Sequence, residues 1–109
     1  MSSLSTHVLD TSHGRPAAGV MLRLLAEGKV LFEGRTDADG RRRDLPALPP
    51  GRYELEFAVA DYFRAQGVAQ SDPPFLDLVC IRFGLAEADA HYHLPLLISP
   101  YGYSTYRGS

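Results

Sequence analysis

Apolar and polar residues alternate along most of this chain, and residues 52–59 show the pattern most clearly. The apolar residues of this segment are Tyr53, Leu55, Phe57 and Val59. Because successive side chains of a strand point to opposite faces of a sheet, the segment would have one apolar face and one charged face. The pattern predicts an antiparallel strand that packs one face against a core.

The same period of two recurs in six other segments, so strands dominate the prediction. The expected strands are residues 4–10, 20–26, 29–36, 75–83, 91–98 and 101–106. Turn residues separate them, with a hairpin turn at 26–29 and an Asp-Gly turn at 37–40. Many short strands joined by tight turns favour an all-β sandwich.

Two segments depart from this alternation. Residues 61–67 are expected to form a short helix, with Asp61 as its N-cap and Gly67 as its terminator. Pro95 lies inside the expected strand at residues 91–98, although proline has no N–H to give to a ladder of hydrogen bonds. Either this strand is irregular at Pro95, or its ladder is interrupted there.

The size and charge of the chain limit what it can be. Its 109 residues, 45% of them hydrophobic, suffice for a single domain over residues 1–109. A formal net charge of −2 gives no general attraction to nucleic acid or to a membrane surface. No apolar run approaches the roughly 18 residues needed to span a bilayer. The N-terminal segment lacks the basic and apolar parts of a signal peptide, so a cytoplasmic location is expected.

Several common catalytic and metal-binding motifs are absent from the sequence. It has no glycine-rich phosphate loop, no nucleophile elbow, no Cys-x-x-Cys and no His-Glu-x-x-His. Cys80 is the single cysteine, so no internal disulfide can form. It lies in the apolar run at residues 78–81 and is expected to be a small buried residue.

Histidines are the first candidates for chemistry. His91 and His93 share one face of the expected strand at residues 91–98, and imidazole is the side chain best suited to move protons near neutral pH. The pair could equally be two surface or interface histidines. A His-x-His pair also suits zinc, with His7 as a possible third ligand and an open position for water.

Three arginines follow the Asp-Gly turn, at Arg41, Arg42 and Arg43. They could form a solvated basic loop. Alternatively, one of them could point inward as a planar multi-donor clamp for a carbonyl-rich or anionic ligand. Alternation alone does not choose among the three, because the geometry of the turn sets their directions.

Four segments together resemble one known family. They are residues 6–10 (Thr-His-Val-Leu-Asp), residues 36–41 (Thr-Asp-Ala-Asp-Gly-Arg), residues 91–105 and the final tetrapeptide Tyr106-Arg107-Gly108-Ser109. The chain resembles the 5-hydroxyisourate hydrolases, the enzymes of the transthyretin-like family, over nearly its whole length. The final tetrapeptide is the signature that separates these hydrolases from the transthyretin hormone carriers. Leu94 and Ile98 stand where the family often has other aliphatic residues.

The resemblance implies a fold, an assembly and a site. The fold would be a transthyretin-like β-sandwich of two four-stranded sheets with one short helix. The assembly would be a homotetramer, a dimer of dimers, with active sites in a central channel at the dimer–dimer interface. By the same resemblance, the catalytic residues are His7, Arg41 and His93. The substrate-binding residues are His7, Arg41, Tyr106 and Ser109.

The resemblance also implies a reaction. It is the hydrolysis of 5-hydroxyisourate to 2-oxo-4-hydroxy-4-carboxy-5-ureidoimidazoline in urate degradation, without a metal or any other cofactor. Two alternatives stay open from the sequence. One is a carrier with the same sandwich that binds a small ligand without turnover. The other is a zinc hydrolase that uses His7, His91 and His93.

Overall fold

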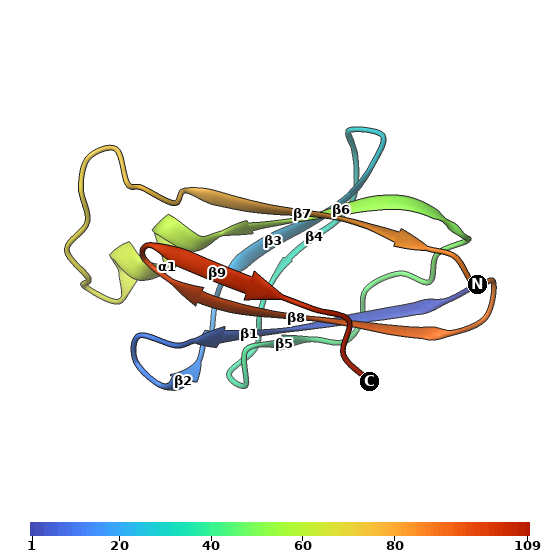
Figure 1. Ribbon diagram of the computed structural model, residues 1–109, viewed down its shortest axis with the longest axis horizontal. Coiled ribbons are helices and arrows are strands. Elements are labelled where there is room, and N and C mark those ends of the chain that lie inside the picture. The colour runs from blue at the N-terminus through green and yellow to red at the C-terminus, as the bar shows by residue number, and fades with distance from the viewer.

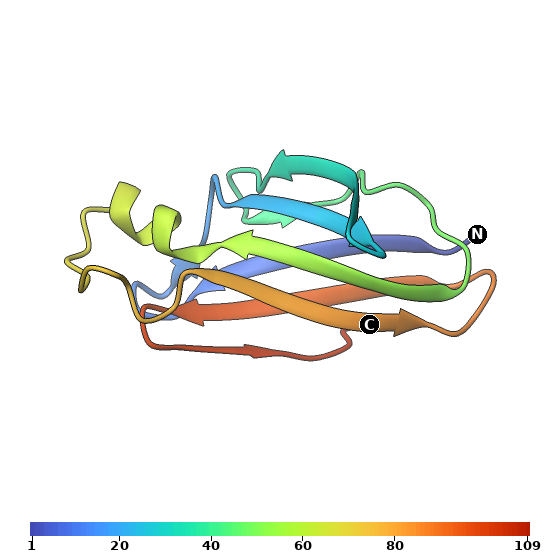
Figure 2. The same cartoon turned by 90° about the horizontal axis from the view of Figure 1, so that it is seen from above.

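Two β-sheets face each other across an apolar core, with a short helix at one end (Figures 1 and 2). The computed structural model describes residues 1–109. The strands are β1 (Ser3–Asp10), β2 (Arg15–Pro16), β3 (Met21–Ala26), β4 (Lys29–Arg35), β5 (Arg41–Arg42), β6 (Gly51–Ala58), β7 (Leu78–Leu85), β8 (His91–Ser99) and β9 (Gly102–Thr105). The helix is α1 (Val59–Ala65).

One sheet has the strand order β2-β1-β8-β9, and the other has the order β4-β3-β6-β7. The short strand β5 also pairs with β1, so the first sheet has five strands rather than the four that the resemblance implies. Strands β2 and β5, of two residues each, are absent from the sequence prediction. Strands β1 and β8 are parallel, while every other pair is antiparallel. The parallel pair is what brings the N-terminal segment beside the His91–His93 segment.

The alternation in the sequence correctly identifies the core faces of the long strands. Strand β6 buries Tyr53, Leu55 and Phe57. Strand β8 buries its even-numbered positions from Tyr92 to Ile98. Each fully buried leucine or phenylalanine contributes about 1.5–3 kcal/mol to folding, so this core fixes which face of β8 is left outward.

The helix starts earlier than the sequence predicts. Its N-cap is Ala58, so Asp61 lies in the first turn and is not the cap. A negative charge in the first turn still interacts favourably with the helix dipole. Gly67 ends the helix as expected, with φ of +77° and an N–H that donates to the Arg64 carbonyl at 3.0 Å. No helix in this protein has the length and apolar character that a membrane crossing requires.

Two expectations for the segment before β7 are wrong. The strand begins at Leu78, and Phe75 lies outside it with 69% of its surface exposed. Cys80 is exposed, because its neighbour Val79 occupies the core position. In a continuous apolar run the composition does not say which alternate residues point inward.

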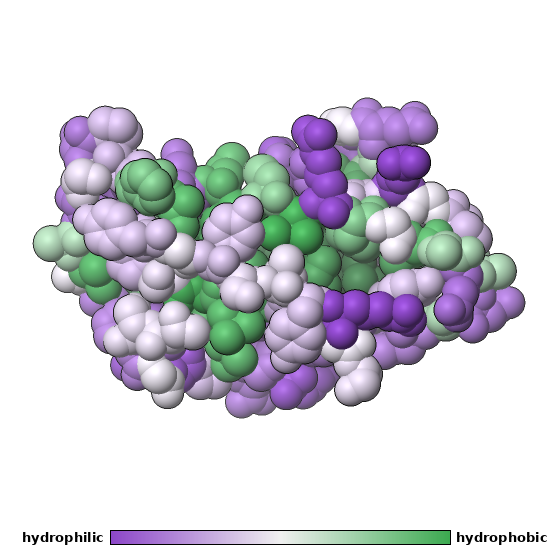
Figure 3. All heavy atoms as spheres, in the orientation of Figure 1, coloured by the Kyte–Doolittle hydropathy of each residue, from purple (hydrophilic) through white to green (hydrophobic).

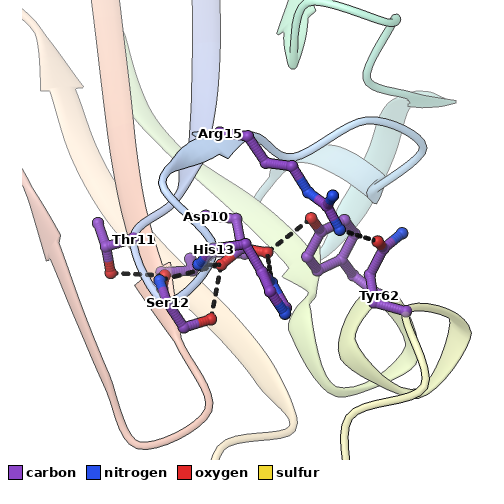
Figure 4. Close-up of polar contacts among 8 residues, drawn as sticks. Asp10, Thr11, Ser12, His13, Arg15 and Tyr62 are labelled. Atoms are coloured by element: carbon purple, nitrogen blue, oxygen red, sulfur yellow. Dashed lines mark hydrogen bonds and ion pairs between the residues drawn. The ribbon is translucent and has the colours of Figure 1, made fainter.

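A buried polar group joins the end of β1 to α1 (Figure 4). Asp10 has a fully buried side chain that accepts hydrogen bonds from Ser12, His13 and the hydroxyl of Tyr62. The Nδ1 atom of His13 also bonds to Asp10 and leaves 33% of the His13 side chain exposed. We call Asp10, Ser12, His13 and Tyr62 the Asp10 cluster. The bond from Tyr62 of α1 to Asp10 of β1 anchors the helix to the first sheet. Every buried polar side-chain atom of the cluster has a partner.

Candidate functional site

A wholly polar hollow lies on the outward face of β1 and β8. It has a volume of about 320 Å³, and no hydrophobic residue lines it. The lining residues are Ser5, Thr6, Arg41, Arg43, His91, His93 and Ser109. A hollow of this size and polarity suits a small, hydrogen-bonding molecule.

The parallel pairing of β1 and β8 builds the floor of the hollow. Its register places Ser3 beside His91 and Ser5 beside His93. The Ser5 Oγ atom is 2.8 Å from Nδ1 of His93 and 3.2 Å from Nε2 of His91. The Ser3 Oγ atom is 2.6 Å from Nδ1 of His91. Two serines and two histidines therefore form one continuous chain of hydrogen bonds.

The Asp-Gly turn at residues 37–40 positions Arg41. The Asp37 carboxylate accepts hydrogen bonds from the N–H groups of Asp39 and Arg41, both at 2.9 Å. Gly40 has φ of +74°, and a Cβ there would lie 2.4 Å from the carbonyl oxygen of Val8. Only glycine fits this approach, which brings β5 onto β1 with Arg41 directly opposite His7.

Alternation after the turn separates the three arginines. Arg41 and Arg43 line the hollow, whereas Arg42 points the other way. The Arg42 guanidinium lies 5.0 Å from the centre of the Phe32 ring and pairs with Asp44 at 2.7 Å. The hollow thus has two guanidinium groups where the sequence alone left the choice open.

The C-terminal tail closes one side of the hollow. The Gly108 N–H donates to the His93 carbonyl at 2.8 Å, and Ser109 lines the hollow. A Cβ on Gly108 would lie 2.7 Å from Cδ2 of His93, so the tail can approach this ring only because residue 108 has no side chain. The tail therefore packs directly on the imidazole.

The position of Pro95 explains how the tail is held. Strand β9 pairs with β8 as far as Leu96 and Thr105, and the isolated bridge between His93 and Gly108 continues the same register. On the β9 side of Pro95 the backbone ladder is interrupted, and the Thr105 hydroxyl donates to the Pro95 carbonyl at 2.7 Å instead, while the pairing with β1 runs through Pro95 unbroken. Of the two alternatives for Pro95, the interrupted ladder is correct.

Burial and the positive charge of Arg41 favour the neutral forms of His7 and His93. Burial lowers the pKa of His93 below 6.5, and the positive charge of Arg41 lowers it further. Burial and Arg41 also lower the pKa of His7, with the Asp39 backbone acting in the opposite direction. Both side chains are therefore mainly uncharged at pH 7 and have a lone pair available to accept a proton.

Two expected site residues lie outside the hollow. His7 is half-buried opposite Arg41 and next to Pro95 in the register, but it is not among the lining residues. Tyr106 lines a different pocket of about 360 Å³, which opens between β7 and the tail. The chain brings together His7, Arg41, His93 and Ser109 in one region, and His93 also lines the pocket of Tyr106, so the two pockets adjoin at this histidine.

The sequence prediction left Ser5, Thr6, Arg43 and His91 out of the site. Ser5 has the same parity as His7, which is the only signal that the sequence offers for it. Its contact with His93 depends on a parallel register between segments 88 residues apart. Such a register is set by the whole sandwich and cannot be read from either segment.

In this structure the ligand atoms of the three histidines of the zinc alternative do not all lie within 4.8 Å of one another. Only Glu54, Glu56 and Cys80 place three possible ligand atoms within 4.8 Å of one another, and they belong to the other sheet. Arginines already pair with both of these carboxylates. The ring nitrogens of His91 are instead bonded to serine hydroxyls.

The β-sandwich and its polar hollow, which is lined by histidine and arginine, are typical of a protein that acts on a small polar molecule. Residues 4–108 match the sequence model described as the HIUase/Transthyretin family. The chain belongs to the HIUase/Transthyretin family.

Individual relatives agree with this assignment. The 5-hydroxyisourate hydrolase of Caulobacter vibrioides is 54% identical, with 100% of both chains covered. The structure of Klebsiella pneumoniae 5-hydroxyisourate hydrolase superimposes with a TM-score of 0.88 at 42% identity and covers 100% of both chains. The crystal structure of transthyretin from Sparus aurata gives a TM-score of 0.85 at 32% identity, covering 97% of this chain and 96% of that one.

Proposed function

We propose that this protein hydrolyses 5-hydroxyisourate to 2-oxo-4-hydroxy-4-carboxy-5-ureidoimidazoline, without a metal. The single observation that carries the proposal is the wholly polar hollow that Arg41 and His93 share, with His7 directly opposite Arg41. A flat, carbonyl-rich substrate matches such a lining. The name of the 54% identical Caulobacter relative supports this choice of substrate.

In the proposed mechanism, His7 and His93 share the proton transfers. A water molecule placed between them gives a proton to one neutral imidazole as its oxygen bonds to the cyclic amide carbonyl carbon. The ring C–N bond then breaks, and the leaving nitrogen takes up the proton from the imidazolium. The product contains the new carboxyl group and the released ureido nitrogen. The lowered pKa values of both histidines support their role as bases at pH 7.

Arg41 has the electrostatic role in this mechanism. Its planar set of donors would hold the substrate oxygens and stabilise the negative charge that develops on the attacked carbonyl. Ser109 would donate a hydrogen bond to the substrate from the side that the tail closes. We retain Tyr106 as a proposed substrate-binding residue, and Tyr106→Phe would test it through KM.

We further propose that the chain assembles as a homotetramer, a dimer of dimers. Strands β7 and β9 end their sheets on the same side of the sandwich, so both have an unpaired edge. Exposed aromatic and aliphatic side chains gather there, namely Phe75, Leu78, Tyr101, Tyr103 and Tyr106. Apolar side chains are also visible in the opening between the two edges (Figure 3). An exposed apolar area along open edges is typical of an interface.

The test is the decay of freshly generated 5-hydroxyisourate, followed by its absorbance with and without the protein. We expect a large acceleration that a chelator leaves unchanged, together with a tetramer by light scattering. Binding without acceleration would favour the carrier alternative and overturn the proposal. Inactivation by the chelator would refute the metal-independent mechanism and favour a metal enzyme instead.

A further inference from the structure

The hydrogen-bonded chain on the floor of the hollow includes two residues that the mechanism above does not use, Ser5 and His91. The Ser5 hydroxyl lies between two imidazoles, at 2.8 Å from His93 Nδ1 and 3.2 Å from His91 Nε2. A hydroxyl has one proton to donate, so it can donate to only one of the two rings and must accept from the other. The protonation of the two rings is therefore coupled through Ser5.

Only two arrangements of protons satisfy every member of this chain. In the first, His93 Nδ1–H donates to Ser5, Ser5 donates to His91 Nε2, and His91 Nδ1–H donates to Ser3. In the second, every one of these hydrogen bonds is reversed. The first arrangement leaves the lone pair of His93 on Nε2, and this atom has no partner among the four hydrogen-bonded side chains. The second puts a proton on that atom.

We propose that Ser5 and His91 are positioning residues for His93, which hold its Nε2 atom unprotonated and carry the Nδ1 proton away from the ring when Nε2 accepts one. This inference rests on the proposed function for its kinetic consequences, although the tautomer of His93 is a property of the protein alone. When Nε2 takes a proton from water, the Nδ1 proton moves to Ser5 Oγ. The Ser5 proton moves in turn to His91 Nε2, so His93 and Ser5 end neutral and His91 becomes the cation.

The surroundings of the two rings favour this transfer. His93 is half-buried. Arg41 of β5 and His7 of β1 are its charged and titratable neighbours. Arg43 lines the same hollow, and the tail lies against the ring at Gly108 and Ser109. A positive charge on His93 is therefore opposed by Arg41 and by burial. His91 is exposed, with Ser3 and Ser5 as its partners, so water can solvate a charge there. The series of hydrogen bonds therefore moves the positive charge from the His93 ring, where it is disfavoured, to the exposed His91 ring.

The first test is a ¹⁵N NMR measurement of the imidazole nitrogens of His93 in the wild-type protein near pH 7.5, which requires no turnover. We expect Nδ1 to be protonated and Nε2 to be unprotonated. In Ser5→Ala, the Nε2–H tautomer should become the major form, and Ser5→Thr should restore the wild-type spectrum because it keeps the hydroxyl. An Nε2–H tautomer in the wild type, or an unchanged tautomer in Ser5→Ala, would overturn the proposal even if the enzyme hydrolyses 5-hydroxyisourate.

The second test is kinetic. Ser5→Ala and His91→Phe should each lower kcat about 10–100-fold, the size expected for the loss of one hydrogen bond to a charged group, with KM nearly unchanged. Because both variants break the same chain, the double variant should be no slower than the slower single variant. Ser104→Ala is the matched control, since Ser104 is an exposed strand serine without a side-chain hydrogen bond. Independent, multiplying effects of the two substitutions would contradict a shared relay.

Discussion

Two polar clusters that contain histidine lie beside β1, one at the hollow and one at the Asp10 end of the strand. They differ in the charge that faces the imidazole. In the Asp10 cluster, His13 bonds to a buried carboxylate that also accepts from Ser12 and Tyr62. In the hollow, His93 has serine as its hydrogen-bond partner and a guanidinium as its charged neighbour. The same residue type thus lies beside an anion in one place and beside a cation in the other.

The comparison shows that the neighbouring charges decide whether a polar cluster contributes to stability or to reactivity. Burial alone would raise the pKa of Asp10, but hydrogen bonds from His13, Ser12 and Tyr62 outweigh it and lower that pKa. Burial together with the carboxylate raises the pKa of Tyr62 to about 12. The Asp10 carboxylate is therefore charged and the Tyr62 phenol is neutral near pH 7. His93 has no carboxylate among its hydrogen-bond partners, and the lowered pKa values of His7 and His93 leave both free to accept a proton.

The largest effect should come from removing His93 or His7, the two proposed bases. His93→Ala and His7→Ala should each lower kcat by about 10²–10⁴, the usual contribution of a general acid or base. Thermal unfolding of both variants should stay close to the wild type, because neither side chain belongs to the core. Near-normal turnover of 5-hydroxyisourate by His93→Ala would show that the proton is accepted elsewhere.

A slightly smaller effect on the rate should follow from removing the positive charge of Arg41. Arg41→Gln should lower kcat/KM by about 10²–10³, which is the typical loss for one donor to a developing oxyanion. Since Arg41 lowers the pKa of both His7 and His93, the acidic limb of the pH–rate profile should also move to higher pH in this variant. The wild-type limb should lie below pH 6.5. An acidic limb at the same pH in both proteins would exclude Arg41 as the charge that keeps the bases neutral.

The Asp10 cluster should respond in stability and not in rate. Asp10→Asn removes the buried negative charge that accepts hydrogen bonds from Ser12, His13 and Tyr62, so we expect a loss of about 3 kcal/mol in the free energy of unfolding. Because folding lowers the pKa of Asp10 below 3.8, its contribution is complete above that pH and disappears as pH falls through the folded value. The wild type and the variant should therefore converge in acid. Denaturant titrations at fixed protein concentration would measure this, with kcat per folded protein as the control.

The sequence predicted the faces of the strands better than their partners. Alternation identified Leu55 and Phe57 as core residues because burial follows the period of two. It missed the start of α1, because Val59 continues the apolar alternation of β6 and is the first helical residue. It also missed β5, since a strand of two residues has no period.

The candidate site was predicted only in part, for a related reason. His7, Arg41 and His93 were named through the family resemblance, and the structure brings the segments that carry them together on one face. Ser5 was missed because its partners lie on a strand whose parallel register is set by tertiary packing. Tyr106 was placed with substrate by resemblance, and it lines a neighbouring pocket that His93 also lines.

The bond between Gly108 and His93 makes one wall of the hollow depend on the residue that it encloses. Any substitution that turns the His93 backbone would release the tail and uncover the ring in a single event. Evolution of a new substrate preference by lengthening or reshaping this tail is accordingly constrained. Each such change has to preserve a side-chain-free contact between residue 108 and the imidazole.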